Sequence, residues 1–438
     1  MLKRKAESQF SDWLENAQNK ALLVKGARQV GKSYLIDYFA GRHFKHVVKF
    51  DMVEQPQVRQ SFSSAESAED LLLRMSVAAS APMVAGETVV IVDEVQQCPN
   101  VVTLIKYLVH QGSFRFILSG SLLGVELENI DSLPVGYVYS VDMVPLDFEE
   151  FCWASGISDE VLQMARSCIS KKTALPDYLY ERLVGVFHRY LMVGGMPDAA
   201  NTFFASNNID EVRKVHENIH SMYIADITKY APKELRMLLR DIYRLVPSEA
   251  GSKNKRFRLS SLQDVKRFSQ VTDHFVWLAS AGVVLPVFNV TAPVSPLLAS
   301  EQRSLFKLFY LDVGMLMSSY PKSVAQGVLD GASSEFAMNM GAVYENFVAQ
   351  ELRAQGVPLR YFVSKKIGEL DFLAEDALGK ITAIEVKSGS SYKTHAALDN
   401  ALHAEGYEIE EAIVLAETNC FSEAGVQYLP VFAAELLS

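Results

Sequence analysis

Cysteine is scarce in this chain of 438 residues, and its four cysteines are scattered. No two of them form a CxxC pair, and no histidine stands at the spacing that a zinc site requires. The sequence therefore predicts neither a disulfide framework nor a zinc site, and a reducing, cytoplasmic setting follows. The cysteines are Cys98, Cys152, Cys168 and Cys420.

Long apolar runs are also lacking. No uninterrupted apolar segment approaches the roughly 20 residues that a helix needs to cross a bilayer. The first 18 residues are charged and amphipathic, and they lack the apolar segment and small-residue cleavage site of a signal peptide. We therefore expect a cytoplasmic protein with no membrane partner.

The chain has no excess of basic residues. It contains 42 Lys and Arg against 52 Asp and Glu, which gives a net charge of −10. This balance argues against a protein whose whole surface is basic and binds nucleic acid. It does not exclude a local basic patch, because net charge does not describe how charge is distributed over the surface. The hydrophobic fraction of 49% is that of a folded protein, and the length predicts several domains.

Four apolar runs alternate with helical stretches in the first 120 residues. Continuous β-branched runs that are separated by helices are typical of a parallel sheet covered on both faces. The first part of the chain is therefore predicted to be an α/β domain. The runs cover residues 21–26, 47–51, 88–94 and 114–119.

The remaining chain divides by pattern into three further regions. Residues 146–233 are helical in pattern, and residues 234–295 show short helices followed by an apolar strand, which suggests a small helical domain ending in a β-wing. A proline-containing linker then precedes a second α/β domain at residues 300–438. With the first domain at 1–145, this predicts four domains.

The octapeptide GARQVGKS fits the pattern G-x-x-x-x-G-K-[ST] and stands between a strand-like and a helical segment. Gly26 and Gly31 permit backbone angles that turn successive N–H groups inward, which makes an anion site at a helix N-terminus. Lys32 is expected to reach the β- and γ-phosphates of ATP, and the Ser33 hydroxyl to ligate Mg²⁺. The predicted nucleotide-binding residues of the loop are Gly26, Ala27, Arg28, Gln29, Val30, Gly31, Lys32 and Ser33.

A second motif, VVIVDE at residues 89–94, is an apolar strand that ends in two acids. Asp93 is predicted to hold magnesium, and Glu94 to orient or deprotonate the attacking water, so that Glu94 and Lys32 are the catalytic residues for ATP hydrolysis. The next strand ends in Ser119 and Ser121, and Ser119 is predicted to contact the γ-phosphate. The alternative is that residues 119–121 form an ordinary Ser-Gly-Ser turn with no contact to the nucleotide.

Five motifs in order, GARQVGKS, IVDEVQ, ILSGS, PLDFEEF and YLMVGGMPDA, resemble bacterial and archaeal AAA-type ATPases that carry a C-terminal DUF4143 domain. The resemblance covers nearly the whole chain, and the Arg28-Gln29 pair and Gln96 are specific to that group. It implies an AAA-type parallel sheet in residues 1–145 and ATP hydrolysis there.

One departure from that family concerns an arginine. Many members place an arginine shortly before the PLDFEEF motif, whereas this chain has Gly136 and Tyr137 and no nearby arginine. An arginine finger at this position is therefore not expected. Arg59, Arg115 and Arg189 are equal candidates for the role.

Residues 261–290 resemble the winged-helix segment of the same family. Six basic residues lie within residues 253–267, and such a patch can hold a nucleic-acid backbone without reading sequence. The expected recognition helix, residues 271–280, has no lysine or arginine and one aspartate. A DNA-binding surface and a solvated basic loop beside a protein-packing helix both remain open.

The last domain carries acids on strand-like runs. Glu369 and Asp371 share one strand face, and so do Glu385 and Lys387, because residues i and i+2 of a strand project together. Glu345 lies on the apolar face of an upstream helix, where burial is costly unless a metal or a cation compensates.

The metal ligands predicted for this domain are Glu345, Asp371 and Glu385, with Lys387 as a catalytic residue that acts against a phosphodiester. The resemblance implies that this domain has the PD-(D/E)XK nuclease fold. A salt-bridged cluster on an inactive nuclease-like scaffold is the alternative.

Two functions for the whole chain follow. In the first, ATP turnover controls DNA binding and metal-dependent cleavage by the C-terminal domain. In the second, the chain is an ATP-switched interaction module whose distal domains bind a protein or nucleic acid without cutting it. A protein partner and another copy of the chain are both candidates for that role.

Overall fold

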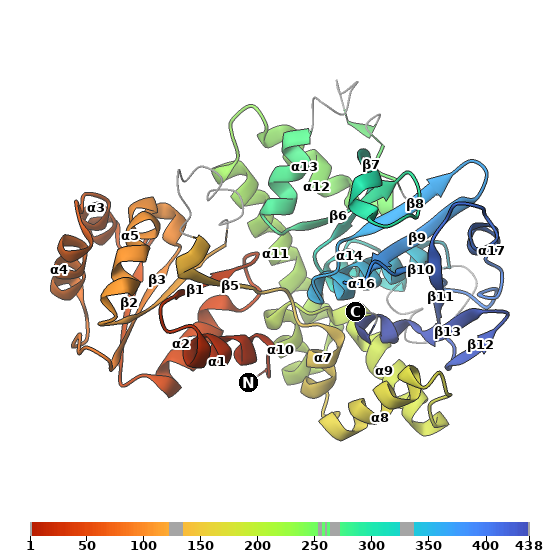
Figure 1. Cartoon of the computed structure of the whole chain (residues 1–438), viewed down its shortest axis with the longest axis horizontal. Helices are drawn as coiled ribbons and strands as arrows, with labels where there is room; N and C mark the ends of the chain where they lie inside the picture. Colours follow the sequence, from red (N-terminus) through yellow and green to blue (C-terminus); the bar gives the residue numbers. More distant parts are fainter. Residues whose placement is uncertain are drawn as a thin grey trace. The chain divides into compact units, whose positions relative to one another are not determined.

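The computed structural model describes residues 2–121, 135–252, 256–258, 261–262, 272–324 and 337–436 (Figure 1). Its contacts divide the chain into two compact units. The N-terminal unit is Arg4–Val144 with Ser280–Gly282, and the C-terminal unit contains Pro145–Ala279 and Val283–Ser438. The division into four domains remains a prediction, because the structure separates only these two units.

A five-stranded parallel sheet forms the centre of the N-terminal unit, in the order β2-β3-β4-β1-β5. The predicted α/β class and the four predicted strands are confirmed, and the sequence missed the fifth strand at the sheet edge. Strand β4 lies between β1 and β3, so the ends of all three strands meet at one edge. The strands are β1 Ala21–Lys25, β2 His46–Asp51, β3 Thr88–Asp93, β4 Arg115–Gly120 and β5 Val138–Asp142.

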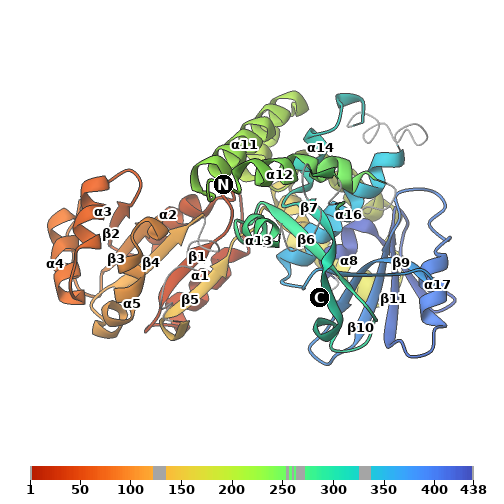
Figure 2. The ribbon, with the colours of Figure 1, turned by 90° about the horizontal axis from the view of Figure 1, so that it is seen from above.

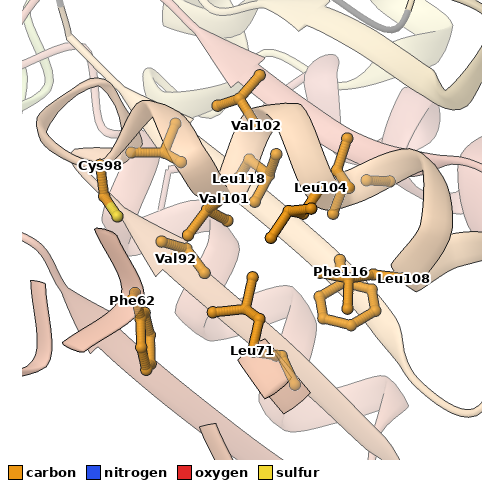
Figure 3. Packing of buried hydrophobic residues seen from close by; sticks show 14 of the residues in the cluster. Phe62, Leu71, Val92, Cys98, Val101, Val102, Leu104, Leu108, Phe116 and Leu118 are labelled. Atoms are coloured by element: carbon orange, nitrogen blue, oxygen red, sulfur yellow. The ribbon is translucent and has the colours of Figure 1, made fainter. Parts of the chain in front are cut away.

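Helices cover both faces of this sheet, which is why its strands are apolar at successive positions (Figures 1 and 2). On one face, α5 packs Val101 and Leu104 over Val92 of β3 and Leu118 of β4 (Figure 3). Each such fully buried side chain contributes about 1.5–3 kcal/mol. The helices are α1 Ala6–Asn16 and α2 Lys32–His43 on one face, and α3 Pro56–Ser63, α4 Ala68–Ala78 and α5 Pro99–Gln111 on the other.

The first part of the C-terminal unit is helical, as predicted. PLDFEEF starts its first helix, because the Asp147 side chain accepts from the N–H of Glu150 while Glu150 caps in return. The helices are α7 Phe148–Ala154, α8 Asp159–Ser170, α9 Asp177–Val193, α10 Pro197–Ser206, α11 Ile209–Tyr230, α12 Arg236–Ala250 and α13 Thr272–Ser280.

A mixed eight-stranded sheet forms the rest of the C-terminal unit, in the order β12-β13-β11-β10-β9-β8-β6-β7. Leu398 of helix α17 belongs to one hydrophobic cluster with Phe362 and Leu370, and α16 contacts β6, β7 and β10. The elements are β6 Val284–Val290, β7 Glu301–Tyr310, α14 Val313–Ser318, α16 Ala337–Ala354, β8 Arg360–Ser364, β9 Gly368–Glu375, β10 Ile381–Val386, α17 Ala396–Leu402, β11 Ile409–Ala416, β12 Phe421–Glu423 and β13 Val426–Pro430.

Strand β6 is the run that the sequence assigned to a β-wing. It pairs with β7 on one side and with β8 on the other, so it belongs to the C-terminal sheet. Residues 263–271 of the predicted winged helix lie outside the described residues. The structure thus gives a helical middle region without support for a separate wing.

The motifs PLDFEEF and VGGMPDA meet at one buried point of the C-terminal unit. Leu146 N donates to Gly195 O at 2.7 Å, and Gly195 N donates to Asp312 Oδ2 at 2.6 Å. Tyr190 donates its hydroxyl to Leu146 O and accepts from Gln350 Nε2. Burial raises the pKa of Asp312 to about 6, although backbone N–H groups oppose that rise. Residues far apart in sequence therefore fix the start of α7.

The close approach of Gly195 to Leu146 generates a prediction about stability. A Cβ at Gly195 would lie 1.9 Å from Leu146 O, a backbone atom that cannot turn away. We expect Gly195→Ala to lower the free energy of unfolding by about 3 kcal/mol or more, measured by urea denaturation. The matched control is Gly185→Ala within α9, where nothing lies within 4 Å and a small gain is expected. Equal stability of the two variants would contradict the packing described.

Candidate functional site

The loop between β1 and α2 has the backbone that the glycine positions predicted. Gly26 has φ 142° and Gly31, the N-cap of α2, has φ 89°, and both are conformations that glycine favours. A Cβ at Gly26 would lie 2.1 Å from Met143 O, so that position has no space for a side chain. Gln29 also has a positive φ, of 67°. The loop thus turns tightly into the N-terminus of α2, where backbone N–H groups attract anions.

Arg4 holds this loop from outside, and sequence reasoning missed it. Its Nη1 donates to Val30 O at 2.9 Å and its Nη2 to Val144 O at 2.6 Å, and the side chain is buried. Two carbonyls satisfied by one guanidinium fix the loop to the segment that follows β5. No motif marks Arg4, because it lies 22 residues before the loop.

Lys32 is buried at the start of α2. Its Nζ donates to Gly26 O at 2.8 Å and to Ala27 O at 2.7 Å. Burial lowers the pKa of Lys32 to about 8, although Glu94 and Asp93 act to raise it. The ammonium is therefore held at the loop by neutral carbonyls, and it loses its proton more readily than an exposed lysine would.

Asp93 ends β3 and links three segments. Its Oδ2 accepts from Ser33 Oγ at 2.9 Å and its Oδ1 from Ser119 Oγ at 2.5 Å. Hydroxyl and carboxylate oxygens are the ligands that Mg²⁺ prefers, and Ser33 and Asp93 offer both side by side. These residues fit the predicted magnesium role. Ser119 binds Asp93, so its predicted contact with a γ-phosphate remains a prediction.

Glu94 follows Asp93 in a left-handed conformation, with φ 50°. Its carboxylate accepts from Gln96 Nε2 at 2.5 Å and from Ser121 Oγ at 3.2 Å, and Arg28 Nη2 lies 3.9 Å away. Arg28 Nε also donates to Ser121 Oγ at 3.3 Å. Arg28 and Gln96, which the family resemblance singled out, therefore converge on Glu94.

The three arginines considered as substitutes for a finger are engaged elsewhere. Arg115 donates to Trp13 O and stacks on that ring at 4.3 Å, and burial lowers its pKa. Arg59 donates to Met52 O, and Arg189, in the C-terminal unit, donates to Gly185 O. Arg28 is the arginine that the structure places beside Glu94.

The predicted acids of the last domain come together around a lysine that sequence reasoning missed. Lys307 of β7 is fully buried, and its Nζ lies 2.9 Å from Glu369 Oε1, 3.1 Å from Glu345 Oε2 and 3.3 Å from Asp371 Oδ1. Burial acts to lower the pKa of Lys307, but the three carboxylates together raise it well above its usual value. A lysine within the apolar run LFKLFYL was the available signal.

Glu385 and Lys387 pair beside this cluster. Lys387 Nζ donates to Glu385 Oε1 at 2.7 Å, and Val386 N donates to Asp371 Oδ2 at 2.9 Å. Burial, and then Asp371, raise the pKa of Glu385 to about 7. In the described part of the chain, no three Asp, Glu, His or Cys side chains form a group that could hold a metal ion. Metal binding by Glu345, Asp371 and Glu385 stays a prediction.

The basic patch lies only partly within the described residues. Arg256 Nε lies 3.8 Å from Glu369 Oε2, and Arg258 Nε lies 3.3 Å from Glu249 Oε2. Both described members are thus paired with carboxylates of the C-terminal unit. The other four basic residues, Lys253, Lys255, Lys266 and Arg267, lie outside the described residues.

Three family models match the chain. Residues 18–152 match an AAA domain, residues 185–323 match a domain of unknown function (DUF8612), and residues 340–432 match a domain of unknown function (DUF4143). A search of curated proteins returned no match. The first and last matches confirm the predicted combination of an AAA-type P-loop domain with a C-terminal DUF4143 domain.

Solved structures of ATPases are similar at low identity. The Walker-type ATPase of Pyrococcus abyssi is 15% identical with a TM-score of 0.45, covering 73% of this chain and 96% of that one. Cdc6p from Pyrobaculum aerophilum is 12% identical with a TM-score of 0.27, covering 76% and 95%. AMPPCP-bound DnaA from Aquifex aeolicus is 9% identical with a TM-score of 0.30, covering 63% and 88%. TM-scores this low carry no weight for function. Of the described helices, none is long and apolar enough to span a bilayer.

The lowered pKa of Lys32 generates a prediction about nucleotide binding. Because the charged amine attracts phosphates and its pKa is about 8, the dissociation constant for ADP should rise about tenfold between pH 7 and pH 9. Titration with a fluorescent ADP analogue measures this. The control is Lys25→Met, which removes a lysine that pairs with Asp142 outside the loop and should keep the same pH dependence. An affinity that stays constant over this range would contradict the effect of burial on Lys32.

Proposed function

We propose that this chain, which combines an AAA domain with a C-terminal DUF4143 domain, binds Mg-ATP, hydrolyses it, and uses the nucleotide state to control what its C-terminal unit binds. The observation that supports hydrolysis is the hydrogen-bonded series from Ser33 through Asp93 to Ser119, with Glu94 adjacent. This series places the loop at residues 26–33, the Ser33 hydroxyl, the Asp93 carboxylate and the adjacent Glu94 at one sheet edge, which supports the proposed roles.

Different residues of the chain are proposed to bind the phosphates and the Mg²⁺ ion. Backbone N–H groups of residues 26–33 accommodate the phosphates, and Lys32 exchanges its two loop carbonyls for phosphate oxygens. Ser33 and Asp93 would hold Mg²⁺. When bound, the ion supplies positive charge to the β- and γ-phosphate oxygens. Ser119 keeps the Asp93 carboxylate in place from the neighbouring strand.

Glu94 is proposed to orient the attacking water and accept its proton. Gln96, Ser121 and Arg28 hold its carboxylate, so an oxygen of Glu94 must exchange one of these partners for water before it can act. This requirement predicts slow turnover in the isolated chain. Arg28 also supplies a positive charge beside the phosphate loop from within the same chain, which is the role that an arginine finger plays elsewhere.

The C-terminal unit has two proposed roles, binding of DNA and binding of a protein partner. The pairing of Arg256 and Arg258 with carboxylates and the net charge of −10 argue against DNA, and thereby favour a protein partner. Phosphate contacts need basic groups whose charge is not already matched. We therefore propose an ATP-switched interaction module, with action on DNA as the competing role.

The ATPase assignment is tested by two substitutions. Lys32→Ala should abolish nucleotide binding, because it removes the phosphate-binding cation. Glu94→Gln should keep binding and lower phosphate release at least about a hundredfold, because the base is lost while the shape is kept. Phosphate release and a fluorescent nucleotide titration measure the two effects. Glu87→Gln, at an exposed site paired with Lys45, is the control and should retain full activity. Normal turnover by Glu94→Gln would refute the base assignment.

The role of Arg28 within its own chain makes a second prediction. Arg28→Ala should lower turnover at least about tenfold and leave nucleotide affinity within a few-fold, since this charge acts on the transition state. Turnover per chain should not depend on protein concentration. Arg42→Ala, which removes an arginine that lies over Tyr38 on α2, is the matched control. Full activity of Arg28→Ala, together with turnover that rises with concentration, would instead indicate an arginine from a neighbouring copy.

A further inference from the structure

Lys307 lies where the acids of the C-terminal unit converge. Its ammonium contacts Glu345 of α16 and both Glu369 and Asp371 of β9, at distances of 2.9 to 3.3 Å. Lys307 and Glu345 are completely buried. Three carboxylates from two elements thus have one internal cation at their centre.

Each carboxylate of the cluster is already paired with a positive charge. Lys307 forms ion pairs with Glu345, Glu369 and Asp371, and Lys387 forms one with Glu385. Arg256 adds a contact to Glu369 at 3.8 Å. Buried carboxylates are tolerated only when such compensation is present, and here the chain itself supplies it.

A divalent cation and the Lys307 ammonium compete for the same oxygens. Glu345 Oε2 and Asp371 Oδ1 both face Nζ, and Asp371 Oδ2 accepts from Val386 N. Magnesium requires oxygens at about 2.0–2.1 Å, so it could enter only after Lys307 left. Two like charges at such a spacing would repel strongly.

The Lys307 side chain is enclosed by buried apolar and aromatic residues. Its neighbours in β7, Phe306 and Leu308, are buried, and its ammonium lies 5.2 Å from the Tyr361 ring and 5.9 Å from that of Phe372. Within the described residues, Glu385 Oε2 is a buried oxygen without a hydrogen-bond partner. This atom could supply one metal ligand, but Mg²⁺ needs several oxygen ligands.

We infer that Lys307 takes the place of the metal in this acid cluster, so that the C-terminal unit is a metal-free, nuclease-like scaffold that does not cleave phosphodiesters by metal-activated water. The cluster instead ties β7 to α16 and β9. This inference deepens the proposed interaction role and rests on it. It concerns the C-terminal unit alone, so its test is independent of the ATPase assignment.

The direct test measures Mn²⁺ binding by the full chain. The starting protein carries Asp93→Asn, which removes the metal ligand of the N-terminal unit. We expect no Mn²⁺ binding at millimolar concentration by electron paramagnetic resonance, and no change on adding Asp371→Asn. Binding of Mn²⁺ that Asp371→Asn or Glu385→Gln abolishes would overturn the inference, because it would show that a metal displaces Lys307.

Lys307→Met supplies the complementary test. Removal of the cation leaves the buried carboxylates of Glu345 and Asp371 without a compensating charge, whereas Glu369 keeps its contact with Arg256. We expect the melting temperature to fall by about 10 °C and to recover when Mn²⁺ is added. Unchanged stability of Lys307→Met would overturn the inference. If this variant does not fold, Lys307→Met combined with Glu345→Gln removes one charge of each sign. The double variant should fold and bind no Mn²⁺, and tight Mn²⁺ binding by it would count against the proposed cluster.

Cleavage is tested on plasmid DNA with Mg²⁺ or Mn²⁺. We expect no cleavage by the wild type or by Lys387→Ala. Cleavage by the wild type that Lys387→Ala removes would overturn the inference. Phosphate release measured on the same samples reports the ATPase independently, so failure of one proposal is distinguishable from failure of the other.

Discussion

The Asp93 carboxylate is the contact on which the N-terminal site depends. It accepts from Ser33 at the start of α2 and from Ser119 at the end of β4, and thereby joins the phosphate loop to two strands. Parallel strands that end at one edge bring these groups together, and the order β3-β4-β1 places Ser119 between the other two. A change at this carboxylate therefore affects the loop, the adjacent Glu94 and the neighbouring strand together.

Two clusters of acids in this chain illustrate how partners decide what a carboxylate does. Glu94 is held mainly by polar groups that water can replace, Gln96 and Ser121, with Arg28 further away at 3.9 Å. The acids around Lys307 are compensated by direct contact with a buried ammonium. A carboxylate of the first kind can exchange a partner for water, whereas one of the second kind is committed to structure. Residue type and spacing alone do not separate the two cases.

Much of the first unit could be predicted from sequence because its signals are local. The loop motif at residues 26–33 and the acids at 93 and 94 each lie within one short segment, and the strands beside them are continuously apolar. Strand β5 was missed because it lies at the sheet edge and carries polar residues such as Ser140. Lys307 could not be placed, because its partners lie 38 to 64 residues away and only the fold brings them together. For the same reason the local pattern of β6 does not show that it pairs with β7 and β8 in the C-terminal sheet.

The hydrogen bonds around Leu146 also have a consequence for the order of folding. The sheet of the N-terminal unit is complete once residue 142 has been made, so its strands can pair early during synthesis. The start of α7 depends on Gly195, on Gln350 through Tyr190, and on Glu351, which accepts from Phe148 N across 203 residues. Contacts of such long range form late, because their loops are costly to close. The nascent chain is thus expected to present a folded AAA domain before most of its remaining residues have formed their long-range contacts.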